Sequence, residues 1–138
     1  MSNDDCMCIS IRKASNNISK LYNCELSNLD IKITQYSVLK NIRNLGNPNV
    51  NELSKKLVLE RTTVLRNLDK LNKMGLISYK KSNINKIKFI YLTANGITKL
   101  NEARIIWEKA QKKFLNALEL NNQNKFDSFM NRISRLNF

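Results

Sequence analysis

The sequence predicts a mainly α-helical domain with a small antiparallel β-hairpin after its midpoint. Only one proline and three glycines interrupt the 138 residues, so few turns are expected. Most segments repeat apolar residues every three or four positions, which is the period of a helix. Residues 76–92 lose that period and are rich in isoleucine and aromatic residues, as strands are. The length is that of one domain.

Two helices are expected at the start of the chain. Apolar residues recur at helical spacing from Ile9 to Leu26. Thr34 can cap a second helix, and Gly46 and Pro48 are expected to end it. The predicted inner face of this second helix carries Val38, Leu39, Ile42 and Leu45.

A pair of short helices is expected next. Asn49 begins the first of them, with Glu52 three residues later as in a capping box. The second runs from about Glu60 to Met74, and Gly75 is a natural C-terminal cap. Its predicted buried stripe consists of Val64, Leu68 and Leu71. Two short helices joined tightly in this way form a helix-turn-helix pattern.

Residues 76–79 and 87–92 are expected to be two strands, joined by a polar and basic loop over residues 80–86. A hairpin with a basic tip directly after a helix-turn-helix is a wing. The fold class is therefore a winged helix-turn-helix, mainly α with a small antiparallel β-wing.

Long helices are expected to close the chain. Thr93 can cap one that reaches about Leu118, and Asn121 or Asn122 begins the last. These helices carry more apolar surface than a small winged module covers, so we expect dimerisation through the N- and C-terminal helices. Residues 1–138 then form a single domain, with dimerisation helices at 1–33 and 94–138 and a winged lobe at 34–93.

The charge of the chain predicts an anionic partner. Lys and Arg number 24 against 11 acidic residues, a net charge of +13. Residues 50–92 hold 10 basic and 3 acidic residues, whereas the other 95 hold 14 and 8. Because this peak coincides with the helix-turn-helix and wing, double-stranded DNA is the expected partner and residues 34–93 the DNA-binding lobe.

A membrane partner fits the sequence less well. A membrane-surface module needs a basic amphipathic helix with exposed aromatic residues. No apolar run approaches the roughly 18–20 residues that span a bilayer. The first eight residues are acidic and polar, without the pattern of a secretory signal, so a cytoplasmic protein is expected.

Enzymatic function is not expected. The chain has no histidine, which removes Ser-His and Cys-His pairs and every histidine-based metal site. No glycine-rich phosphate loop is present, and no cofactor is expected. Zinc held by the three cysteines with Asp4 or Asp5 matches no standard spacing, so no metal is expected either.

One face of the helix at 60–74 is a candidate DNA-reading surface. At about 100° per residue, Thr62, Arg66, Asp69 and Lys73 point away from the buried stripe. Arginine can bind guanine edges, and threonine can contact thymine methyls or phosphate. The alternative is a solvated helix face without a partner. The candidate DNA-binding residues are Arg61, Thr62, Thr63, Arg66, Asn67, Lys70 and Lys73 on this helix and Lys81, Lys86 and Lys88 on the wing.

Residues 61–68 (RTTVLRNL), followed by Leu71 and Gly75-Leu76-Ile77, resemble the recognition helix of MarR-family transcriptional regulators. Residues 34–39 (TQYSVL) resemble the opening of that family's second helix, and residues 92–96 (LTANG) resemble its "LTxxG" after the wing. Ala103, Trp107, Ala110 and Gln111 match a pattern of one branch. The resemblance covers about residues 6–118.

The resemblance implies a dimeric regulator, usually a repressor of a pseudo-palindromic operator. It also implies release by a small aromatic ligand that binds between the dimer helices and the DNA-binding lobe, where Arg12 and Tyr36 are candidate pocket residues. A non-specific DNA-organising protein is the alternative that shares the charge. We interpret Trp107 as a core or dimer-interface residue.

The wing departs from the family pattern. The family's usual Asp-Arg falls at Ile84-Asn85, and Lys86 and Lys88 are the nearest basic residues. A flexible lysine reads the minor groove less well than an arginine. We therefore expect the wing to contribute more to phosphate affinity than to sequence choice.

The spacing of Cys8 and Tyr22 resembles that in the organic-hydroperoxide-sensing branch of the family. This favours, as an alternative function, a cysteine-based peroxide-sensing regulator in which Arg12 supplies positive charge one helical turn from Cys8. Against it, Arg12 occupies the position of the family's other tyrosine, and the C-terminal half has no cysteine. An inert, buried thiol is the other interpretation of Cys8.

Overall fold

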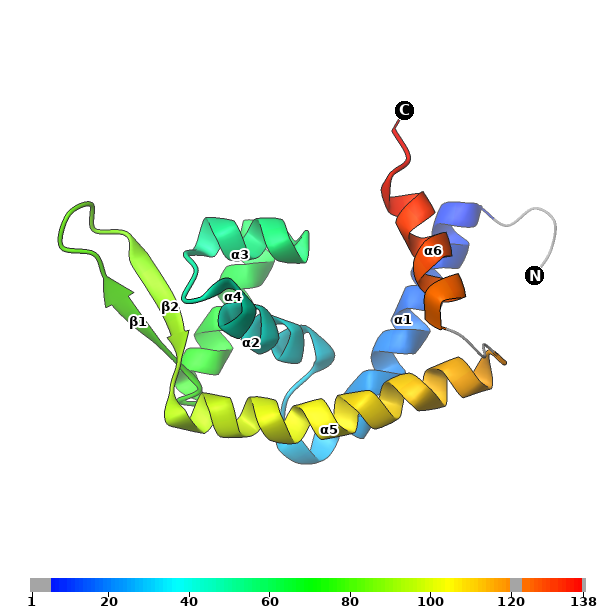
Figure 1. Ribbon diagram of the computed structural model, residues 1–138, viewed down its shortest axis with the longest axis horizontal. Coiled ribbons are helices and arrows are strands. Elements are labelled where there is room, and N and C mark those ends of the chain that lie inside the picture. Colours follow the sequence, from blue (N-terminus) through cyan, green and yellow to red (C-terminus); the bar gives the residue numbers. More distant parts are fainter. Residues whose placement is uncertain (1–5, 120–122, 138) are drawn as a thin grey trace.

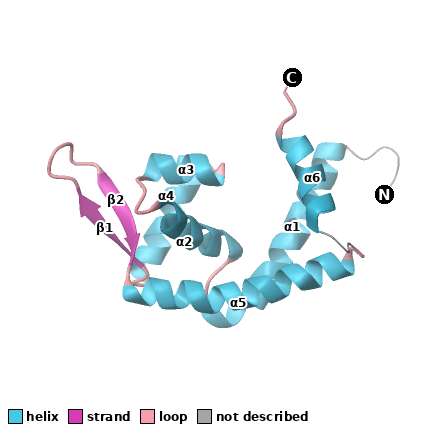
Figure 2. Ribbon diagram, viewed as in Figure 1, coloured by secondary structure: helices cyan, strands magenta, loops and turns pink. Residues whose placement is uncertain are grey.

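A computed structural model of the chain describes residues 6–119 and 123–137, and it has the predicted order of elements. Figure 2 shows helices throughout, with one β-hairpin. The elements are α1 (Met7–Glu25), the short 3₁₀ helix η1 (Ser27–Leu29), α2 (Ile33–Leu45), α3 (Val50–Leu57), α4 (Arg61–Lys73), β1 (Ile77–Lys81), β2 (Lys88–Leu92), α5 (Ala94–Ala117) and α6 (Gln123–Ser134). The prediction of a mainly helical fold with a small wing is confirmed.

The core of the winged lobe lies where α2, α3, α4 and the hairpin meet (Figure 1). The predicted stripe of α4 is fully buried, and so are Leu39 and Ile42 of α2. Leu53 of α3 and Ile90 of β2 complete the contact between the helices and the hairpin. Burial of this apolar surface holds α4 against the lobe by one face, so its opposite face is free.

The ends of α3 and α4 follow from local sequence. Asn49 accepts a hydrogen bond from the Glu52 amide at 2.9 Å, and the Glu52 carboxylate accepts one from the Asn49 amide at 3.4 Å, so the capping box is confirmed. At the end of α4, Gly75 has φ +74°. Its amide donates to the Asn72 carbonyl, and the Leu76 amide donates to the Leu71 carbonyl. This pair of bonds is a Schellman motif, which requires a left-handed residue at Gly75.

The N-cap of α2 lies two residues earlier than expected. Lys32, in extended conformation, is the N-cap, and its amide donates to the Gln35 side chain at 3.0 Å. The Asn23 side chain of α1 accepts the Ile33 amide at 2.8 Å. Thr34 therefore lies inside the helix, because the side chains of Gln35 and Asn23 satisfy the first amides of the earlier start.

The wing is an antiparallel pair in which Ile77 faces Leu92 and Lys81 faces Lys88. Strand β1 continues two residues beyond the predicted end at Tyr79. The apolar pattern stops there, but backbone pairing with β2 does not depend on apolar side chains and extends to Lys81.

The helix α5 runs from the winged lobe toward the part of the molecule where α1 and α6 lie (Figure 1). The Thr93 hydroxyl accepts the Gly96 amide at 3.1 Å, which confirms the predicted cap. At the far end, the rings of Phe114 and Phe126 meet edge to face with centroids 5.4 Å apart, so α6 packs on α5. The predicted start of the last helix at residues 121–122 lies outside the described residues, and α6 is described from Gln123. Among the described helices, none combines the length and apolar character needed to cross a membrane.

Candidate nucleic-acid interface

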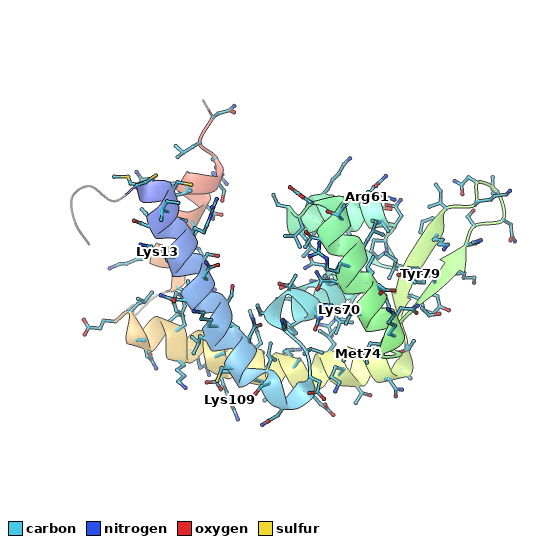
Figure 3. The ribbon with its side chains drawn as sticks, turned by 180° about the vertical axis from the view of Figure 1, so that it is seen from behind. Lys13, Arg61, Lys70, Met74, Tyr79 and Lys109 are labelled. Atoms are coloured by element: carbon cyan, nitrogen blue, oxygen red, sulfur yellow. The ribbon has the colours of Figure 1, made fainter. Side chains whose placement is uncertain are left out.

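The face of α4 opposite its buried stripe is exposed, as predicted. Figure 3 shows this helix running from Arg61 toward Met74 along an open side of the lobe, with Lys70 on it. Thr62, Arg66 and Lys70 are exposed. Val64, Leu68 and Leu71 are buried, and their burial fixes the rotation of α4 about its axis. This rotation decides which side chains of α4 face solvent.

The cations of this face are not equivalent. Lys73 forms a 2.9 Å ion pair with Asp69, one turn earlier, and both side chains are mostly exposed. Arg66 and Lys70 form no ion pair within residues 6–119 and 123–137. Arg66 therefore presents a full positive charge near the middle of the helix, while the charge of Lys73 is partly compensated.

Two other predicted residues, Thr63 and Asn67, are half-buried on the flank of α4. The Asn67 amide nitrogen donates to the Thr63 carbonyl at 2.9 Å, which holds that side chain against its own helix. The amide oxygen of Asn67 and the Thr63 hydroxyl are thus at the edge of the face, while Arg66 is at its centre.

Arg61 links the two helices of the helix-turn-helix. Its guanidinium donates to the side-chain oxygen of Asn51 on α3, and both residues are exposed. The bond restricts a long side chain at the first turn of α4. Asn51 was not predicted as a site residue, because a contact ten positions apart between two helices leaves no periodic signal in the sequence.

A groove of about 590 Å³ separates α4 from the wing. Arg61 and Leu65 lie on its α4 side, and Tyr79, Lys86 and Lys88 on its wing side (Figure 3 labels Arg61 and Tyr79). Lys88 lies over the Tyr79 ring, with its nitrogen 5.7 Å from the ring centroid. Lys81, Lys86 and Lys88 are all exposed. The groove therefore has cations on both walls. The distance between the cations of α4 and those of the wing depends on how the hairpin folds against the lobe.

Sequence reasoning missed Leu65 and Asn72, which also line this groove. The same helical rotation that faces Arg66 outward turns these two residues toward the wing. Helical periodicity predicts the direction in which Leu65 and Asn72 point around the axis of α4. It does not predict on which side of α4 the wing lies.

The predicted redox residues are not brought together within the chain. Cys8 and Arg12 are exposed near the start of α1, whereas Tyr22 is buried near its end. Since α1 is continuous, Cys8 and Tyr22 are about 21 Å apart along its axis. The Tyr22 hydroxyl instead donates to Gln111 of α5 at 3.0 Å, and burial raises the pKa of Tyr22.

All three cysteines are free and exposed, so the interpretation of Cys8 as a buried thiol is wrong for the chain taken alone. The backbone amides of Ile9 and Cys8 lower the pKa of the Cys6 thiol, which lies at the N-terminus of α1. The metal ligands considered at Asp4 and Asp5 lie outside the described residues.

Tyr36, a predicted ligand-pocket residue, is packed in the core. Its ring stacks on that of Trp107 with centroids 5.8 Å apart, and burial raises the pKa of its hydroxyl. The Lys40 nitrogen lies 4.4 Å from the centroid of the Trp107 ring. Trp107 is partly buried against the core, in agreement with the interpretation of Trp107 as a packing residue.

The helix-turn-helix, the exposed basic face of α4 and the adjoining hairpin define a winged helix-turn-helix protein. The sequence model of the MarR family matches residues 31–86, nearly all of which lie within the winged lobe, in agreement with the resemblance. The match to this family model indicates a DNA-binding transcriptional regulator, a class that is not enzymatic.

Solved structures extend the similarity to nearly the whole chain. The transcriptional regulator MosR of M. tuberculosis is 24% identical, with a TM-score of 0.83 over 97% of this chain and 96% of that one. MosR in complex with DNA is 25% identical, with a TM-score of 0.75 over 96% and 100%. A mutant of E. coli MarR with operator DNA is 21% identical, with a TM-score of 0.82 over 92% of each chain. No curated protein matches by sequence.

Proposed function

We propose that the chain is a homodimeric repressor that binds a pseudo-palindromic operator and is released by a small ligand. The observation that carries the DNA-binding part is the exposed, cationic face of α4 beside a groove with cations on both walls. In each protomer α4 enters a major groove, where Arg66 faces the base edges. The two helices of a dimer then lie about 34–36 Å apart on one side of the duplex.

Relatives of the same fold support this reading. MepR of S. aureus has been solved with DNA, and CouR is a transcriptional repressor solved on a 23-mer duplex. PcaV of Streptomyces coelicolor has been solved with its natural ligand, which supports ligand release. For this chain we retain an aromatic effector near Arg12 and Tyr36 as a proposal from family resemblance, together with a cytoplasmic location.

The direct test is selection of bound duplexes from a random DNA pool. Enrichment of a palindrome, bound about 1,000-fold more tightly than random DNA or better, is the expected result. Equal affinity for all sequences would instead identify a non-specific DNA-organising protein.

Dimerisation is proposed through the terminal helices. Met7, Ile9 and Ile11 of α1 are exposed, as are Phe129 and Met130 of α6. Ile18 of α1 and Phe126 of α6 line one cavity of about 170 Å³, so the two helices are neighbours. Figure 1 shows both of them at the opposite end of α5 from the wing. Exposed apolar side chains gathered at one end of a chain favour a self-association surface.

Phe129→Asp is expected to weaken self-association by about 100-fold or more, because each dimer would desolvate two carboxylates at an apolar contact. Sedimentation equilibrium measures the change. Ser128→Asp is the matched control, since Ser128 lies on the polar side of the same helix and should leave the dimer intact. A wild type that sediments as a monomer at micromolar concentration contradicts the dimer.

Lys86→Ala is expected to weaken binding equally on selected and random duplexes, because Lys86 lies on the groove wall where a phosphate would pass. The plot of log affinity against log salt should flatten by about two units per dimer. Titrations at several salt concentrations measure this slope. Lys109→Ala, which removes an exposed lysine of α5 (Figure 3), should not change it. An unchanged slope in Lys86→Ala would place Lys86 off the DNA.

A further inference from the structure

The tip of the wing presents an apolar side chain to solvent. Ile84 is 96% exposed, more than any other exposed large apolar residue of the described chain. It does not contribute to the core, and it lies at the end of a hairpin that extends away from the helices (Figure 1). Since core packing does not explain an isoleucine here, its role depends on what the tip meets.

Hydrogen bonds within the loop shape this tip. The Ser82 amide donates to the Ile87 carbonyl at 2.9 Å and closes the loop. The Ser82 hydroxyl accepts the Ile84 amide at 3.3 Å, and the Asn85 side chain accepts the Ile87 amide at 3.4 Å. Ile84 is therefore held in a loop with an ordered backbone.

The chemistry around Ile84 suits a narrow space between two phosphate chains. Its neighbours Asn83 and Asn85 are neutral, and a side-chain amide such as that of Asn83 can donate to base edges. No acidic residue occurs between residues 76 and 101, so the hairpin is not repelled by phosphates on either side. Within the hairpin, lysines occur only on the two strands and at Lys86, behind the tip.

The groove between α4 and the wing sets where the tip goes. In B-DNA each sugar-phosphate chain separates a major from a minor groove. If α4 occupies the major groove, Arg61 and Lys86 on the two walls of the protein groove flank one such chain. The hairpin tip then lies beyond that chain, at the adjacent minor groove.

We propose that Ile84 is an apolar wedge that enters the minor groove beside each half-site and selects A·T pairs there. This inference rests on the proposed function. Isoleucine is among the side chains that proteins insert between base steps of the minor groove. A G·C pair adds an amino group to the floor of that groove, which would block the wedge and meet no acceptor on it. The wing thus adds sequence choice, beyond the phosphate affinity expected from its lysines.

The experiment uses the full chain and a duplex selected from a random pool, with the base pairs flanking each half-site varied. Three flanks are compared: A·T, G·C and inosine·C. Inosine lacks only the minor-groove amino group of guanine, so inosine·C keeps the major groove of G·C. Wild type should bind the A·T and inosine·C duplexes about tenfold more tightly than the G·C duplex, a difference of the size expected for one blocked side chain.

Ile84→Ala should bind all three duplexes alike, at about the affinity of wild type for the G·C flank, and Ile84→Leu should restore the preference. Ile97→Ala, an exposed isoleucine on α5, is the matched control and should behave as wild type. A thymine in the flanking A·T step should react faster with permanganate when wild type is bound and not when Ile84→Ala is bound, because the wedge unstacks that step.

If wild type binds the G·C and inosine·C duplexes equally well, the wedge is overturned and the proposed function stands. The same holds if Ile84→Ala keeps the preference of wild type for inosine·C over G·C. A wild type that selects no sequence and binds no duplex preferentially overturns the proposed function and the wedge together.

Discussion

Arg66→Ala is expected to weaken binding of the selected operator by about 1–3 kcal/mol for each half-site, and to change binding of random DNA little. Arg66 is exposed at the middle of α4 and has no ion-pair partner within residues 6–119 and 123–137. The substitution removes a bidentate donor to a guanine edge without touching the buried stripe, so the fold should survive. Fluorescence anisotropy with both duplexes at one salt concentration measures the two affinities.

Lys73→Ala is the matched comparison, because it also removes one positive charge from the same face of α4. The ion pair with Asp69 already compensates Lys73, so its removal should cost less on the operator than removal of Arg66. If Arg66→Ala weakens operator and random DNA equally, Arg66 contacts phosphate and reads no base.

The fold was predictable because its signals are local. The stripe of Val64, Leu68 and Leu71 gives both the helix and its rotation, and all three are fully buried. The glycine after α4 and the capping box at Asn49 gave the boundaries of the helix-turn-helix nearly to the residue. In each case the responsible residues lie within one or two turns of each other, where a sequence pattern can be read.

The candidate site was predictable only in part, because some of its contacts join residues that are far apart in the sequence. The exposed face of α4 follows from periodicity, but the groove with the wing depends on how the hairpin packs against α2 and α4. Asn51 and Leu65 enter the site through that packing. Sequence spacing does not reveal distant partners such as Gln111, which accepts a hydrogen bond from Tyr22, 89 residues away.

The charge of the chain likewise predicts the region of the candidate site but not the role of each residue in it. The density of lysine and arginine indicates residues 50–92 as the surface to consider, since net charge adds up without regard to geometry. It could not separate Arg66 from Lys73, whose charges differ in effect because only one has a partner at 2.9 Å. The prediction about Arg66 therefore comes from the structure and the sequence together.

Gly96→Ala is expected to cost about 3 kcal/mol of the free energy of unfolding, the upper end for overpacking. Gly96 is buried in the first turn of α5, and a Cβ there would lie 1.9 Å from the Leu76 carbonyl oxygen. That oxygen accepts the Thr93 amide at 3.1 Å, and the Thr93 hydroxyl donates to the Gly75 carbonyl at 2.6 Å. The backbone of two elements must separate to admit one methyl group, and the hydrogen bonds that join α5 to the wing would be strained with it.

Gly46→Ala separates this clash from backbone strain. Gly46 has φ +66°, and a Cβ there would meet nothing within 4 Å, so its substitution should cost only about 1 kcal/mol for the left-handed backbone. Urea unfolding of both variants and wild type, at one protein concentration because a dimer's stability depends on it, gives the two differences. Equal losses in the two variants would mean that the contact between Gly96 and Leu76 relaxes without cost. A larger loss in Gly96→Ala would explain physically why the segment at residues 92–96, by which the chain resembles its family, ends in glycine.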